Sequence, residues 1–145
     1  KVLEQLNTVE DFLRDLVDAP DGATRWKLLA ERPELISTDL ILLLYPSQVE
    51  LVSKYNFDKA VDLYHLAIAI ETKLGRIAQV VDLLNALAVQ FGSRGDQNRE
   101  LEYYLKSLEL REQLPENQRE SGTYVYANLG TIYSAQGNYE QALKW

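Results

Sequence analysis

The chain contains no cysteine, no methionine and a single histidine, with only four prolines and seven glycines in 145 residues. The lack of cysteine excludes a disulfide framework and a thiol nucleophile. With His65 as the lone imidazole, the usual zinc ligand sets are excluded as well, so we expect no metal and no cofactor. The cysteine count favours no particular redox compartment. The missing methionine indicates a piece of a longer protein or a processed chain.

Positive charge is also scarce, because 15 Lys and Arg stand against 22 Asp and Glu, which gives a net charge of −7. An acidic chain repels a phosphate backbone, so we expect no nucleic-acid partner. The longest apolar run, 40–45, is far shorter than the roughly 18 residues that cross a bilayer, and the N-terminal segment is acidic and amphipathic. We therefore expect no membrane partner and a cytoplasmic location.

Apolar residues recur at helical spacing, and no alternating strand pattern is present. The first stripe predicts a helix that begins at a capping box, Thr8 to Asp11, and ends at 19–22. A second short helix over 23–32 is expected to carry Trp26 and Leu29 inward. The first stripe consists of Val9, Phe12, Leu13, Leu16 and Val17.

Self-comparison reveals a repeat of about 40–42 residues. A shift of 42 places Leu84, Leu87, Ala88, Phe91 and Gly95 on Tyr126, Leu129, Gly130, Tyr133 and Gly137, and a shift of 40 aligns 61–74 with 101–114. Each unit is predicted to be a helix, a tight turn and a second helix. The expected organisation is a helical cap or degenerate repeat at 1–40, a degenerate repeat at 41–80, a repeat at 81–122 and a repeat at 123–145 truncated in its second helix.

The predicted turns carry their own chemistry. Gly95 and Gly137 are placed where a first helix must end in a left-handed conformation, and Asp96 and Asn138 follow as caps of the second helix. Asn56 stands at the equivalent position without a glycine before it. Pro46 is expected to kink or shorten the helix that contains it. Small residues at Ala60, Ala88 and Gly130 predict close approach of paired helices.

The segment Tyr126–Ala142, with Leu129-Gly130, Tyr133, Gly137 and Tyr139, resembles a tetratricopeptide repeat. The resemblance covers about 41–145 and is closest to a long-repeat variant, with a longer linker such as 115–121. It implies an all-α fold: a right-handed superhelical array of antiparallel helix pairs with an N-terminal helical cap. The lead-in segment 31–35 has a weak similarity to repeat arrays of caspase-like (CHAT) domain proteins.

No constellation of residues predicts catalysis. Gly92 to Gly95 lacks the lysine and the preceding strand of a phosphate loop and is read as a turn. His65 lies on a helix rich in core residues, and Glu100 and Glu102 are expected on different, solvated helix faces. Tyr64, Tyr104, Tyr126 and Tyr133 are assigned to core packing with the hydroxyl at the rim. We expect that this part of the chain is not an enzyme.

In a stack of helical hairpins, the first helix of each pair lines the concave surface. The resemblance also implies that an asparagine just before Leu-Gly contacts a bound peptide backbone; Asn128 matches that place, and Asn85 is one residue off. A bond from Asn128 to a neighbouring helix is the equally weighted alternative. The predicted partner-binding residues are Tyr45, Val49, Asn85, Val89, Tyr124, Asn128 and Thr131.

The predicted function is a non-enzymatic scaffold that binds a peptide or protein segment in this groove. The inner helices carry no lysine or arginine before Arg94, so neutral to basic partners are favoured over acidic ones. Two alternatives stay open. One is a regulatory or sensor region of a larger enzyme, such as a CHAT-type protease, a kinase or a signalling ATPase. The other is a self-association module, and the oligomeric state is left open.

Overall fold

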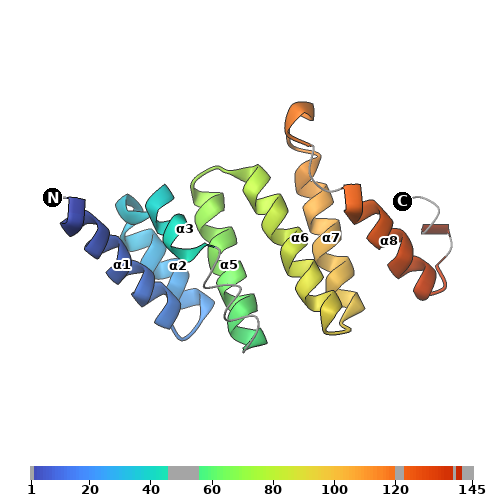
Figure 1. Ribbon diagram of the computed structural model, residues 1–145, viewed down its shortest axis with the longest axis horizontal. Helices are drawn as coiled ribbons and strands as arrows, with labels where there is room; N and C mark the ends of the chain where they lie inside the picture. The colour runs from blue at the N-terminus through green and yellow to red at the C-terminus, as the bar shows by residue number, and fades with distance from the viewer. Residues whose placement is uncertain (1, 46–55, 120–122, 139, 142–145) are drawn as a thin grey trace. The chain divides into compact units, whose positions relative to one another are not determined.

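A computed structural model describes residues 2–45, 56–119, 123–138 and 140–141 (Figure 1). These ranges hold seven α-helices and two short 3-10 helices, and the α-helices form packed antiparallel pairs. The all-α prediction is confirmed, and the arrangement is consistent with a tetratricopeptide-like helical array. The chain divides into two compact units, residues 1–75 and 76–145.

The first unit contains α1 (Val2–Asp18), α2 (Gly22–Glu31), η1 (Pro33–Leu35), α3 (Thr38–Leu44) and α5 (Phe57–Lys73). Helix α3 packs against both α1 and α5. The predicted stripe on α1 is buried except for Val17, which is half-buried. The buried apolar residues of this unit are Val9, Phe12, Leu13, Leu16, Leu29, Leu40, Ile41, Leu44, Ala60, Leu63, Leu66, Ala67 and Ile70.

Two predictions for this unit are wrong. Helix α1 begins at Val2, so Thr8 lies inside the helix and not at its N-terminus; no glycine or proline interrupts the segment before it. Trp26 is 54% exposed and lies under the ammonium of Lys73, with Nζ 5.1 Å from the ring centroid. The inward positions of α2 belong to Arg25 and Leu29, four residues apart on one face, and Trp26 is one position off that face.

Arg25 is the centre of a charged cluster that joins three helices, here called the Arg25 cluster: Arg25, Lys59 and Asp62. The guanidinium forms a two-pronged ion pair with the Asp62 carboxylate of α5. Its Nε also donates to the Leu16 carbonyl oxygen at 2.7 Å, and Lys59 Nζ donates to the Val17 carbonyl oxygen. These two cations satisfy carbonyls that the end of α1 leaves without intrahelical partners.

Pro46, which was expected to kink or shorten the helix that contains it, lies outside the described residues; before it, α3 has seven residues and ends at Leu44. Tyr45 follows in an extended conformation (φ −89°, ψ 158°). A residue before proline is disfavoured in the helical region, because the proline ring clashes with its backbone.

The second unit contains α6 (Ile77–Ser93), α7 (Gln97–Arg111), η2 (Glu116–Gln118) and α8 (Thr123–Ala135). Figure 1 shows α6 and α7 as an antiparallel hairpin, and α7 also packs against α8. Helix α6 begins four residues before the predicted repeat start at Val81. Ala88, where close approach was predicted, is fully buried in a core formed by Ala88, Tyr104, Leu108, Val125, Leu129 and Ile132.

The predicted turn chemistry is confirmed. Gly95 and Gly137 have φ values of 81° and 76°, a region that side-chain-bearing residues rarely adopt. Gly75 has a φ of 73° and closes a turn that the sequence analysis missed. A side-chain cap then starts the next helix at equivalent places, with bonds from Lys59 N to Asn56 (3.1 Å), Arg99 N to Asp96 (3.1 Å) and Gln141 N to Asn138 (3.3 Å).

Next to its turn, the α6–α7 hairpin is held by stacked aromatic and cationic groups. The rings of Phe91 and Tyr103 are nearly parallel, with centroids 5.4 Å apart. Arg99 lies over Phe91 and Lys106 over Tyr103, at 5.3 and 5.0 Å. Cation–π contacts of this kind stabilise by about 0.5–1 kcal/mol at exposed sites, and here they also cover an aromatic pair from solvent.

Candidate protein-binding surface

On α6, the solvent-facing stripe is small and polar apart from one valine. Asp82 and Ser93 are exposed, Ala86 is half-buried, and Val89 is 44% exposed, one of few large apolar side chains with that much exposure among the described residues. The helical spacing of these four residues puts them on one face. The prediction that Val89 faces solvent is therefore confirmed.

Asn85 lies on the other side of α6, and its predicted place in the groove is wrong. The residue is 1% exposed, in register with Val81 and Ala88 of the buried stripe. The neighbouring Ala86 holds the position that matches Asn128. The Asn85 Oδ1 accepts no hydrogen bond from the described residues, which makes its burial costly.

On α8, Asn128 and Thr131 behave differently from each other. Asn128 is half-buried, and its Nδ2 donates to the Tyr104 hydroxyl of α7 at 2.9 Å. The bond to a neighbouring helix, the alternative that the sequence left open, is therefore confirmed. Thr131 is exposed, with its hydroxyl 3.0 Å from the Ala127 carbonyl oxygen.

These residues define what we call the α6–α8 surface: Asp82, Val89, Ser93, Thr131 and Ser134, all exposed. The two helices that carry these stripes share one core, to which Ala88 of α6 and Ile132 of α8 belong. Its residues are small and uncharged except for Asp82, so it offers shallow contacts rather than an ionic site.

Three predicted partner-binding residues remain: Tyr45, Val49 and Tyr124. Tyr45 belongs to the first unit, where it is half-buried and caps α3. Val49 lies outside the described residues, and so does the side chain of Tyr124. Their role in binding stays a prediction.

Removal of the Tyr104 hydroxyl tests whether its hydrogen bond with Asn128 stabilises the second unit. Tyr104→Phe removes the acceptor of the Asn128 amide while it keeps the buried ring. We expect the free energy of unfolding to fall by about 1 kcal/mol, the usual net value of such a bond. Urea denaturation measures this change. No change in either Tyr104→Phe or Asn128→Ala would mean that the bond does not stabilise the unit.

Glu100 departs from the solvated state predicted for it. Its carboxylate packs against the α-carbon of Gly92, where an added β-carbon would lie 1.4 Å from Oε2. Burial raises the pKa of Glu100 above its ordinary value of 4.5. Glu102, by contrast, is exposed and pairs with Lys106 at 3.0 Å. The glycine thus makes room for a carboxyl group at the hairpin interface.

Removal of this partly buried charge should stabilise the protein at neutral pH. Because the pKa of Glu100 is raised on folding, the folded state loses stability as pH rises above the unfolded value, and the loss is absent below it. Glu100→Gln should raise the free energy of unfolding at pH 7 by a small amount, because solvent screens much of the penalty, and should give no gain at pH 3.5. Thermal unfolding at both pH values measures this change in stability, with Glu102→Gln as the control. A destabilised Glu100→Gln at pH 7 would contradict the burial penalty.

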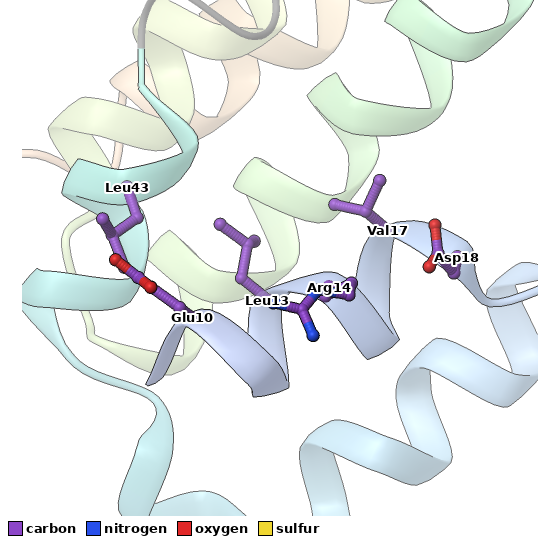
Figure 2. Close-up of a pocket in the computed structure, with 6 residues that line it drawn as sticks. All are labelled: Glu10, Leu13, Arg14, Val17, Asp18 and Leu43. Atoms are coloured by element: carbon purple, nitrogen blue, oxygen red, sulfur yellow. The ribbon is translucent and has the colours of Figure 1, made fainter. Parts of the chain in front are cut away.

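A cavity in the first unit was missed by the sequence analysis. It has a volume of about 330 Å³, between α1 and α3. Figure 2 shows Leu43 reaching from α3 toward α1. The α1 residues that line it are Glu10, Leu13, Arg14, Val17 and Asp18. The signal in the sequence was the excess of acids on α1, which has five carboxylates and one base and no cation in its last turn.

No catalytic arrangement appears among the described residues. His65 is exposed and lines a cleft of only about 50 Å³ beside Trp26. No group of three or more potential metal ligands is present in the described part of the chain. None of the helices in the described ranges is both long and apolar enough to cross a bilayer.

Comparison with known families agrees with the fold at the C-terminal end. Residues 124–145 match the family model of the tetratricopeptide repeat. This match begins in α8 and suggests membership of the tetratricopeptide family. Such a repeat region points to a non-catalytic module with protein partners in general. No curated protein and no solved structure matches the chain.

Proposed function

We propose that this chain is a protein-binding scaffold whose partner contacts the α6–α8 surface. The observation that carries the proposal is the exposure of Val89. Its side chain is 44% exposed, whereas the other large apolar residues of α6 are buried or half-buried. The match of residues 124–145 to a tetratricopeptide repeat supports it, since such repeats serve as protein-interaction modules. A surface with one apolar residue among small polar ones suits an extended or helical segment that is held by shallow contacts.

The charge of this surface favours particular partners. Asp82 is its one ionised residue, and no lysine or arginine belongs to it. A neutral or basic segment would therefore bind without like-charge repulsion. An acidic segment would be repelled by Asp82 and by the negative net charge of the chain. Asn128 is not a primary contact in this proposal, because its amide is already bonded to Tyr104.

Substitutions on the surface test the proposal. Val89→Arg and Thr131→Arg should each reduce partner capture at least about tenfold, because an arginine there blocks close packing and has to be desolvated. Gln113→Arg is the charge-matched control, exposed and outside the surface. Equal melting temperatures must show that all variants stay folded. Unchanged capture in both surface variants would refute the proposal. If light scattering shows a dimer that the surface variants abolish, the partner is a second copy of the chain, and the self-association alternative is favoured.

A further inference from the structure

We propose that the cavity between α1 and α3 is a second docking site, which takes a basic amphipathic helix of a partner protein. An apolar side chain of that helix enters the cavity, and lysines or arginines on either side of it face Glu10 and Asp18. The inference rests on the first unit alone and is independent of the α6–α8 surface.

The cavity combines apolar walls with an acidic rim. Its volume, about 330 Å³, is at the lower end of the range of ligand pockets. Leu13, Val17 and Leu43 give it apolar walls. Figure 2 shows Leu13 and Val17 in a row along α1, with Glu10 toward one end and Asp18 at the other. The carboxylates thus lie on either side of an apolar centre.

The charges around the cavity favour a basic partner. Arg14 is the one base among the described lining residues, and it is paired with Asp11 at 3.1 Å. No described cation forms an ion pair with Glu10 or Asp18. A second copy of this chain, with its net charge of −7, would bring mostly like charge to the site. A basic partner is complementary.

The helix dipole strengthens this preference. Asp18 is the last residue of α1, where the helix dipole is negative and a carboxylate is unfavourable. Arg25 and Lys59 bond the carbonyls of that end, but their charges are engaged by Asp62. Proteins keep such an unfavourable charge mainly at functional sites. Here a cation of the partner, bound to Asp18, would offset it.

Helix geometry sets the spacing of the partner's charges. Glu10 and Asp18 are eight residues apart, about 12 Å at a rise of about 1.5 Å per residue. A helix that lies along α1 with one apolar residue opposite Leu13, about midway between the two carboxylates, and a cation one turn before and one turn after it comes close to this spacing. Residues one turn apart share a face, so all three side chains of the partner point toward the cavity.

The test is a fluorescence-anisotropy titration with a labelled, alanine-rich helical peptide. The peptide has a central leucine and a lysine one turn to either side. Two companion peptides replace the lysines by glutamates, or the leucine by alanine. We expect the lysine–leucine peptide to bind, and each companion to bind at least about tenfold more weakly at low salt. Failure of the lysine–leucine peptide to bind, or equal binding of the glutamate peptide, would overturn the proposal.

Protein variants assign the binding to this cavity. Glu10→Gln with Asp18→Asn should weaken the lysine–leucine peptide about tenfold, because both rim charges are lost without a change of shape. Asp15→Asn is the matched control: an exposed carboxylate of α1 that does not line the cavity. Val89→Arg should leave the affinity unchanged, which separates this result from any failure of the α6–α8 surface. Equal loss in the Asp15 variant would show general acidity instead of a site and would overturn the proposal.

Discussion

Asp62→Asn is expected to lower the free energy of unfolding of the first unit by about 2 kcal/mol. The Arg25 side chain is 7% exposed, and asparagine would leave its guanidinium buried without a countercharge. Loss of one partner of a fully buried pair costs about 3–5 kcal/mol. The expected loss is smaller because the Asp62 side chain is 37% exposed, so solvent screens part of the interaction.

Urea denaturation followed by circular dichroism measures the effect. Glu102→Gln is the matched control, because it removes one carboxylate from an exposed pair with Lys106 and should cost at most about 0.5 kcal/mol. The paired change of Arg25→Met with Asp62→Leu should recover much of the lost stability, since it removes the uncompensated charge. Equal losses in Asp62→Asn and Glu102→Gln would mean that the Arg25 cluster does not hold α1, α2 and α5 together.

Leu129→Ala is expected to lower the free energy of unfolding of the second unit by about 3 kcal/mol. Leu129 is 0% exposed in the core that α6, α7 and α8 share. Truncation of a buried leucine loses the burial of its methyl groups and leaves a cavity, at a cost of about 2–5 kcal/mol. Tyr104 and Leu108 lie on α7, which packs against both α6 and α8, so this core has little freedom to collapse.

The chain offers the same substitution at an exposed position. Leu42 is 63% exposed, and Leu42→Ala should change stability by less than about 0.5 kcal/mol. The comparison separates burial from the chemistry of the substitution. If Leu129→Ala and Leu42→Ala have similar effects, α8 does not pack against the hairpin as described.

Features set by local backbone chemistry could be predicted from the sequence. The left-handed glycines at Gly95 and Gly137 and the caps at Asp96 and Asn138 were predicted because each needs only residues next to it in the chain. The buried stripe of α1 and the small Ala88 also follow from the 3.6-residue period and from side-chain size. The missed turn at Gly75 has the same glycine chemistry, so that signal was available in the sequence.

Features that depend on distant partners could not be predicted. Trp26 was placed inward on hydrophobicity, but Arg25 takes the buried side of α2 because Asp62, 37 residues further on, neutralises it. Asn85 is a different case: it was placed in the groove one residue off the Asn128 position, but its place on α6 follows the phase of Val81 and Ala88, which the sequence already contained. The α1–α3 cavity could not be located for a related reason: the acids of α1 indicate its charge, but its walls come from two helices that sequence alone does not bring together.

Site-specific photocrosslinking tests the central claim, that the α6–α8 surface binds a partner protein. A photoreactive side chain placed at Val89, at Thr131 and, as the control, at Gln113 is activated in a lysate of the source cells. We predict a covalent adduct with the same partner protein from both Val89 and Thr131, and none from Gln113. No adduct at either surface position, or equal adducts at Gln113, would contradict the claim.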